Sequence, residues 1–144
     1  TTIKKNRGYN YLLDYGYALT PKITTFLSAR GNVYKSSLKG YDTPEPFWMH
    51  QAFAGASIRV YLKSNEPSFY LQSGYGYGLF SISDIPNLNT DRHFGQSAIF
   101  TVGYEVHTLW NLQLDYMHNN IESSALEDFA LTSHSLAISL NFNP

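Results

Sequence analysis

The sequence predicts an all-β fold, an antiparallel up-and-down β-barrel whose strands cross a membrane. Apolar and aromatic residues alternate with small or polar residues along most of the chain, which is the period of a strand with two different faces. Tyrosine and phenylalanine number 12 and 9 while charged residues make up 15%, against about 25% in typical soluble domains. No run of 18 apolar residues could form a transmembrane helix. The 144 residues suffice for one domain, so we expect a single barrel domain over residues 1–144.

The first strand is expected over residues 9–19. Odd positions from Tyr9 to Leu19 are tyrosine or leucine, whereas even positions are mostly small or polar. Residues 1–8 lack an apolar stretch, so they contain no signal peptide and are expected to be the remnant of an extracellular loop. The Thr20-Pro21-Lys22 segment then predicts a short turn.

Six further strands follow the same alternation. They are expected over residues 23–33, 51–62, 69–79, 98–106, 110–116 and 136–142. A soluble β-sandwich also alternates, but its wet face should carry Lys, Glu and Thr. Here the polar face is rich in Gly, Ser and Asn with isolated charges, which favours a barrel with lipid outside and a filled lumen inside.

The connections alternate in length and set the topology. Short turns are expected at Pro21, Asn65 and Thr108, and long connections over residues 35–48, 83–93 and 122–131. In outer-membrane barrels the short turns are periplasmic, so the first and last of the seven strands run in the same direction. We therefore expect an eighth, N-terminal strand before Thr1 to be missing, either cleaved or on another chain. The alternatives are a parallel seam or an unrecognised strand.

The inward positions carry several charges, and an eight-stranded barrel is just wide enough for side chains to fill it. Buried charges without partners are too costly, so we expect a polar lumen network. Its members are Asp14, Arg30, Arg59, Glu105 and Asp115. The alternative is a narrow ion path.

Three segments resemble the eight-stranded opacity-protein and OmpA-like outer-membrane barrels. They are Tyr17-Ala-Leu-Thr-Pro-Lys-Ile, Val102-Gly-Tyr-Glu-Val-His-Thr-Leu-Trp-Asn-Leu-Gln-Leu-Asp-Tyr and the closing Ser133-His-Ser-Leu-Ala-Ile-Ser-Leu-Asn-Phe. This resemblance implies a bacterial outer-membrane location and a surface, adhesive or scaffolding role without catalysis.

The last three strands also resemble lipid A 3-O-deacylase barrels. In that family a His-x-Ser pair faces lipid near the outer rim and a glutamate comes from the final strand. His118 matches the histidine, but the nucleophile position holds Asn120 and the acid position holds Thr132. An amide cannot attack an ester as a serine does, so this resemblance implies a deacylase-like barrel that has lost its nucleophile.

The outward parity of His118, Asn120, Thr132 and His134 predicts a cluster near the extracellular rim, because the sixth and last strands should pair. Protonated histidines there would contact lipopolysaccharide phosphates. The alternative is ordinary polar residues above the hydrocarbon. No metal site is predicted, because third and fourth ligands are not evident.

The segment before the third strand contains Phe47 and Trp48 beside two prolines. Stiff loops with exposed aromatic residues bind partners at low entropic cost, so this loop is the candidate partner contact. The alternative is that both rings dip into the membrane interface.

The function expected is therefore that of a non-catalytic membrane anchor, surface or adhesive protein, or subunit of an envelope assembly. Its expected partners are outer-membrane lipids and lipopolysaccharide, with other envelope proteins or a chain that supplies the missing strand as further candidates. The net charge of −1 and the absence of a basic run argue against nucleic acid. The absence of cysteine excludes thiol chemistry, and no motif calls for a cofactor.

Overall fold

The computed structural model describes residues 3–38, 46–64, 68–83, 90–107, 110–122 and 130–142. Its seven strands are β1 (Ile3–Thr20), β2 (Ile23–Leu38), β3 (Pro46–Tyr61), β4 (Ser68–Ser83), β5 (Thr90–His107), β6 (Trp110–Glu122) and β7 (Ala130–Phe142). In this part of the chain no helix is long and apolar enough to cross a membrane.

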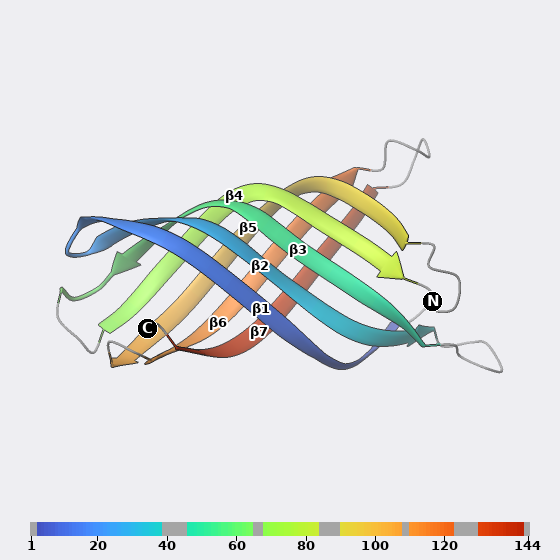
Figure 1. Cartoon of the computed structure of the whole chain (residues 1–144), viewed down its shortest axis with the longest axis horizontal. Coiled ribbons are helices and arrows are strands. Elements are labelled where there is room, and N and C mark those ends of the chain that lie inside the picture. Colours follow the sequence, from blue (N-terminus) through green and yellow to red (C-terminus); the bar gives the residue numbers. More distant parts are fainter. Residues whose placement is uncertain are drawn as a thin grey trace.

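The strands form one sheet in chain order, and each pairs antiparallel with the next. Figure 1 shows the sheet curling round so that the long, tilted strands β1–β3 cross over β5–β7. The prediction of an all-β, antiparallel up-and-down fold with seven strands is confirmed. Because six successive pairs are antiparallel, β1 and β7 run in the same direction, and within the described residues they form the two edges of the sheet.

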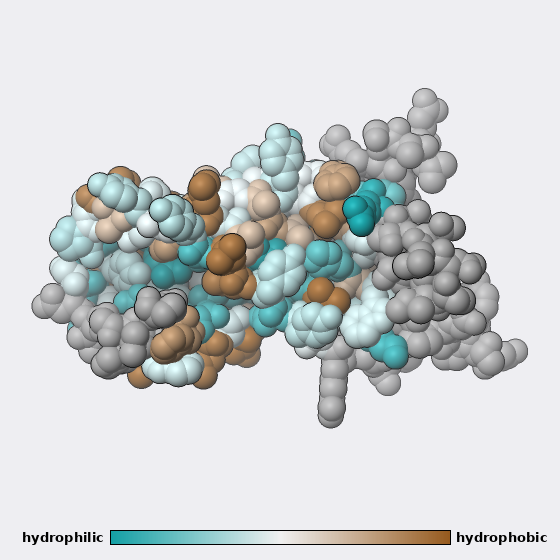
Figure 2. Space-filling model, viewed as in Figure 1, coloured by the Kyte–Doolittle hydropathy of each residue, from teal (hydrophilic) through white to brown (hydrophobic). Residues whose placement is uncertain are grey.

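Backbone register carries the sequence alternation around the whole sheet. Tyr11 lies beside Gly31, and Gly31 beside Ala52, which continues one face from β1 to β3. That outer face exposes large apolar side chains, with Tyr15 at 79% and Ile138 at 74% exposure. The opposite, inner face buries polar groups, including Arg30 at 3% and Arg59 at 5% exposure. In the space-filling view, teal residues are visible in a hollow between paler and brown side chains (Figure 2).

The lumen is not entirely polar. One buried apolar cluster contains Tyr34, Met49 and Phe80, and another contains Phe53, Ile99 and Met117. The first cluster comes from the end of β2, the beginning of β3 and the end of β4, so it fills the lumen near the rim where the long connections lie.

All seven strands extend beyond the ranges that the sequence predicts, so residues 35–38, 46–48, 83, 90–93, 122 and 130–131 are strand rather than part of the expected long connections. Two of these extensions also overturn predictions about particular residues. β1 begins at Ile3, paired with Leu38, so residues 3–8 are strand rather than the expected loop. β3 begins at Pro46, so Phe47 and Trp48 lie in a strand opposite Ser36 and Lys35, and not in the expected partner loop.

The physical reason is that backbone ladders need no apolar side chains. The paired segments therefore continue past the part of each strand in which apolar and polar residues alternate. The short turns predicted at Asn65 and Thr108 lie outside the described residues, whereas the turn at Pro21 and Lys22 is present.

Candidate functional site

A charged network crosses the lumen and joins strands far apart in the sheet. Arg30 on β2 forms an ion pair with Asp115 on β6 and a second with Asp14 on β1, Nη2 to Oδ2 at 3.1 Å. Arg59 on β3 reaches the same Asp14 oxygen at 3.3 Å. Thr101 donates to Asp115 at 2.6 Å and accepts from Arg30 at 2.6 Å. Two guanidinium groups and two carboxylates therefore neutralise one another within a buried cluster.

Arg59 is also held by aromatic rings. Its Cζ atom lies 4.5 Å from the centroid of Phe26 and 4.3 Å from that of Tyr70, a cation–π arrangement on two sides. Its Nε donates to Gln72 at 2.9 Å. Five groups thus fix this guanidinium, counting Asp14 and the hydroxyl of Tyr61, which accepts from Nη1 at 3.3 Å.

Of the five charged residues predicted for the lumen, the structure brings four into direct contact. The fifth, Glu105, is connected indirectly, because it accepts a hydrogen bond from Tyr61 at 2.9 Å. Among the described residues, the buried atoms Asp14 Oδ1, Arg30 Nε and Gln51 Oε1 have no hydrogen-bond partner. The arrangement is a network of charged and polar groups that spans the interior from β2 to β6.

Sequence reasoning missed Tyr70, which is fully buried. Its hydroxyl donates to Gln113 at 2.9 Å, and its ring lies against Gly103, where an added Cβ would overlap it. Tyr70 has the same even numbering as the inward residues Gln72 and Gly74, so strict parity would have placed it inside.

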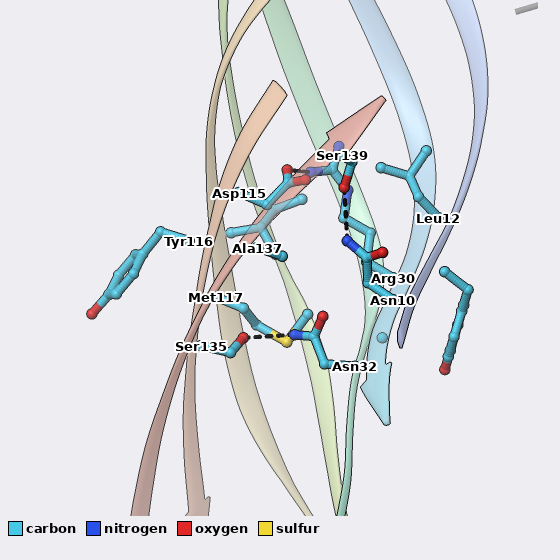
Figure 3. Close-up of a pocket in the computed structure, with 13 residues that line it drawn as sticks. Asn10, Leu12, Arg30, Asn32, Asp115, Tyr116, Met117, Ser135, Ala137 and Ser139 are labelled. Atoms are coloured by element: carbon cyan, nitrogen blue, oxygen red, sulfur yellow. Dashed lines mark hydrogen bonds and ion pairs between the residues drawn. The ribbon is translucent and has the colours of Figure 1, made fainter. Parts of the chain in front are cut away.

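The two edges of the sheet approach each other at a seam (Figure 3). Asn10 on β1 donates to Ser139 on β7 at 2.7 Å, and Asn32 on β2 donates to Ser135 on β7 at 2.8 Å. A pocket along the seam is lined by these residues and reaches Arg30 and Asp115. The described parts of β1 and β7 are not paired by backbone hydrogen bonds. Side-chain hydrogen bonds from β1 and β2 to β7 therefore connect the two edges of the sheet.

The rim residues predicted to cluster lie on neighbouring strands. His118 is opposite His134, and Asn120 is opposite Thr132. The two imidazole rings lie 4.8 Å apart, with 3.3 Å between their Nδ1 atoms. The Tyr116 hydroxyl lies 2.6 Å from His134 Nδ1, and its ring stacks on that imidazole at 22°. We name Tyr116, His118 and His134 the rim histidine cluster.

A second outer-face contact joins β1 and β3. The Tyr11 hydroxyl lies 2.9 Å from His50 Nε2. Its ring crosses Gly31 on the intervening strand, where any Cβ would overlap the ring. Nearby, Tyr9 and Trp48 lie 6.4 Å apart, so Trp48 belongs to an aromatic group on the outer face.

Comparison of the chain with protein-family models, curated proteins and solved structures found no match. The two resemblances drawn from the sequence therefore remain predictions.

Proposed function

We propose that this chain is a small, non-catalytic β-barrel of the bacterial outer membrane, serving as an anchor, surface or adhesive protein or as a subunit of an envelope assembly. The observation that carries the proposal is the distribution of polarity. Exposed leucine, tyrosine and phenylalanine side chains cover the outer face, while ion pairs fill the interior. Burying one such apolar side chain is worth about 1.5–3 kcal/mol, so this face favours a hydrocarbon environment.

Aromatic pairs near the strand ends also support insertion in a bilayer. Phe69 and Tyr104 lie 4.5 Å apart, and Trp110 and Phe142 lie 5.1 Å apart, where β4, β6 and β7 begin or end. Tyrosine and tryptophan are enriched at both membrane interfaces. These pairs would belong to the aromatic girdle at the periplasmic membrane interface, and Tyr9 with Trp48 would belong to the girdle at the extracellular interface.

The proposal is tested by inserting the chain into lipid vesicles and placing arginine at two depths. Leu114 is outward and lies between Val102 and Ile138 near the middle of the sheet. Leu114→Arg should destabilise the inserted protein by about 2–4 kcal/mol, whereas the matched Thr132→Arg near the rim should cost at most about 1 kcal/mol. Urea unfolding from vesicles measures both values.

Equal effects at the two depths would contradict the proposal. So would a wild-type protein that is folded and monodisperse without detergent.

The absence of catalysis is tested separately. Asn120 and Thr132 occupy the positions where the deacylase resemblance requires serine and glutamate, so we expect no fatty acid to be released from lipid A. Release that disappears in His118→Ala would overturn this part of the proposal and leave the membrane location intact.

The half-buried imidazole of His118 and the exposed imidazole of His134, which lie beside Asn120 and Thr132, favour one second candidate, contact with lipopolysaccharide headgroups at the outer rim. Native mass spectrometry of the protein with added lipopolysaccharide tests this contact. Retention should fall in His118→Ala and remain in His50→Ala, and equal retention by all three proteins would exclude the cluster as the contact.

A further inference from the structure

The rim histidine cluster brings two nitrogen donors together on the outer face. His118 on β6 and His134 on β7 are direct cross-strand partners. Their Nδ1 atoms lie 3.3 Å apart and their rings are tilted by 43°. The two donor nitrogens therefore lie in direct contact, close enough for one small ion to replace the hydrogen between them.

The spacing of these donors matches that of two imidazole ligands on a tetrahedral ion. Zinc–nitrogen bonds of about 2.0–2.1 Å at the tetrahedral angle place two nitrogens about 3.3–3.4 Å apart. We propose that His118 and His134 form a binding site for a divalent transition-metal ion on the outer face of the β6–β7 pair.

The neighbouring residues favour this use of the pair. Stacking on Tyr116 fixes the His134 ring, and orientation of a ligand ring by its neighbours strengthens metal sites. Within the described residues no third histidine, cysteine or carboxylate joins the pair, so water would complete the coordination, and the Tyr116 hydroxyl would release its 2.6 Å contact with His134 Nδ1 when that nitrogen binds the ion. On the other side, the β5 residue opposite His118 is Ala98, whose methyl group leaves room for an ion and its water ligands.

The number of protons on the two imidazole rings need not change when an ion replaces the hydrogen bond between them. A neutral imidazole carries one N–H and one acceptor nitrogen, so the contact between the two Nδ1 atoms requires a hydrogen on one of them. Binding of the ion moves that hydrogen to Nε2 of the same ring. Both Nδ1 lone pairs then face the ion, and neither histidine changes its charge.

The ligand chemistry selects the class of ion. Imidazole nitrogen suits Zn²⁺, Cu²⁺ and Ni²⁺, whereas Ca²⁺ and Mg²⁺ prefer oxygen ligands. An ion held in this position would link β7, which has a single neighbour in the described sheet, to β6 near the rim. The bound ion would thus be a cross-link that holds the edge strand β7 to its neighbour.

His50 provides a matched control. It is also on the outer face and also contacts a tyrosine hydroxyl, through Nε2 to Tyr11 at 2.9 Å. Its cross-strand neighbours are Val33 and Ser81 rather than a second histidine, so it offers one imidazole in a comparable setting.

The test is a calorimetric titration of the full chain, folded in detergent micelles, with Zn²⁺. We expect one ion per protein, with affinity reduced at least tenfold in His118→Ala and in His134→Ala and unchanged in His50→Ala. The absence of binding, or an equal reduction in His50→Ala, would overturn the assignment.

Electron paramagnetic resonance of the wild type with one equivalent of Cu²⁺ needs no variant to fold. Hyperfine coupling to two nitrogens is expected, and coupling to one would overturn the site. Both measurements use micelles, so they are independent of the vesicle experiment that tests the proposed membrane location.

Discussion

Neutralising Asp14 should be among the most damaging changes in the lumen, because a single oxygen serves both arginines. Its Oδ2 lies 3.1 Å from Arg30 and 3.3 Å from Arg59. In Asp14→Asn the shape is kept and the charge is lost. Arg30 retains its pair with Asp115, but Arg59 is left with no carboxylate within ion-pair distance among the described residues. Removing one partner of a buried pair typically costs about 3–5 kcal/mol.

The measurement is urea unfolding in micelles or vesicles, with Glu105→Gln as the matched carboxylate-to-amide control. Glu105 accepts one hydrogen bond from Tyr61 and forms no ion pair in the described structure, so its substitution should cost about 1 kcal/mol. A loss in Asp14→Asn no larger than that in Glu105→Gln would refute the reasoning. Adding Arg59→Met to Asp14→Asn should recover part of the loss, because the unpaired buried charge is then removed.

Three further changes test other contacts. Gly103→Ala should destabilise the protein by about 1–3 kcal/mol in urea, because its Cβ would overlap the Tyr70 ring; unchanged stability would show that the ring is not held there. Asn10→Ala should cost about 1 kcal/mol by the same assay, since it removes the hydrogen bond to Ser139 across the seam and leaves that of Asn32. A loss above about 3 kcal/mol would contradict this assignment. Arg30 spans the lumen through its ion pairs with Asp14 and Asp115. We therefore expect no steady conductance of the wild type in planar bilayers and more frequent channel openings in Arg30→Ala. A steady wild-type current would contradict the expectation that these side chains block the lumen.

The sequence was sufficient to predict the two faces of the strands over most of their predicted ranges. Apolar and polar positions alternate with period two, and pairing in chain order carries that parity from β1 to β7, with register shifts near strand ends at Lys5/Gly8, Ala18/Thr20 and Glu105/His107. The same parity placed Asp14, Arg30, Arg59 and Asp115 inside and the rim histidines outside. It also brought His118 and His134 to neighbouring strands, because consecutive antiparallel strands usually pair.

Alternation could not predict where the strands end or which lumen groups touch. The ladder between β2 and β3 continues through Lys35 and Trp48 because backbone groups pair regardless of side chain. The two-sided packing of Arg59 between Phe26 and Tyr70 depends on the curvature of the sheet, which joins positions 11 to 33 residues apart. The 3.3 Å separation of the histidine nitrogens depends on ring rotation, which no sequence pattern contains.

The buried charges of the lumen specify the register of the strands, which an alternating pattern alone does not specify. Outer residues of β3 include Ala52, Ala54 and Ala56, and a shift of two residues would return one alanine to the place of another. Such a shift preserves the faces, so an apolar environment distinguishes it weakly from the native pairing. It would move a guanidinium by about 6.8 Å along the strand, beyond the reach of its carboxylate. The pairs of Arg30 and Arg59 with Asp14 tie β1, β2 and β3 to one register, and the pair of Arg30 with Asp115 extends this constraint across the lumen to β6. Alternation therefore selects the faces, and the buried ion pairs select one register among those that share them.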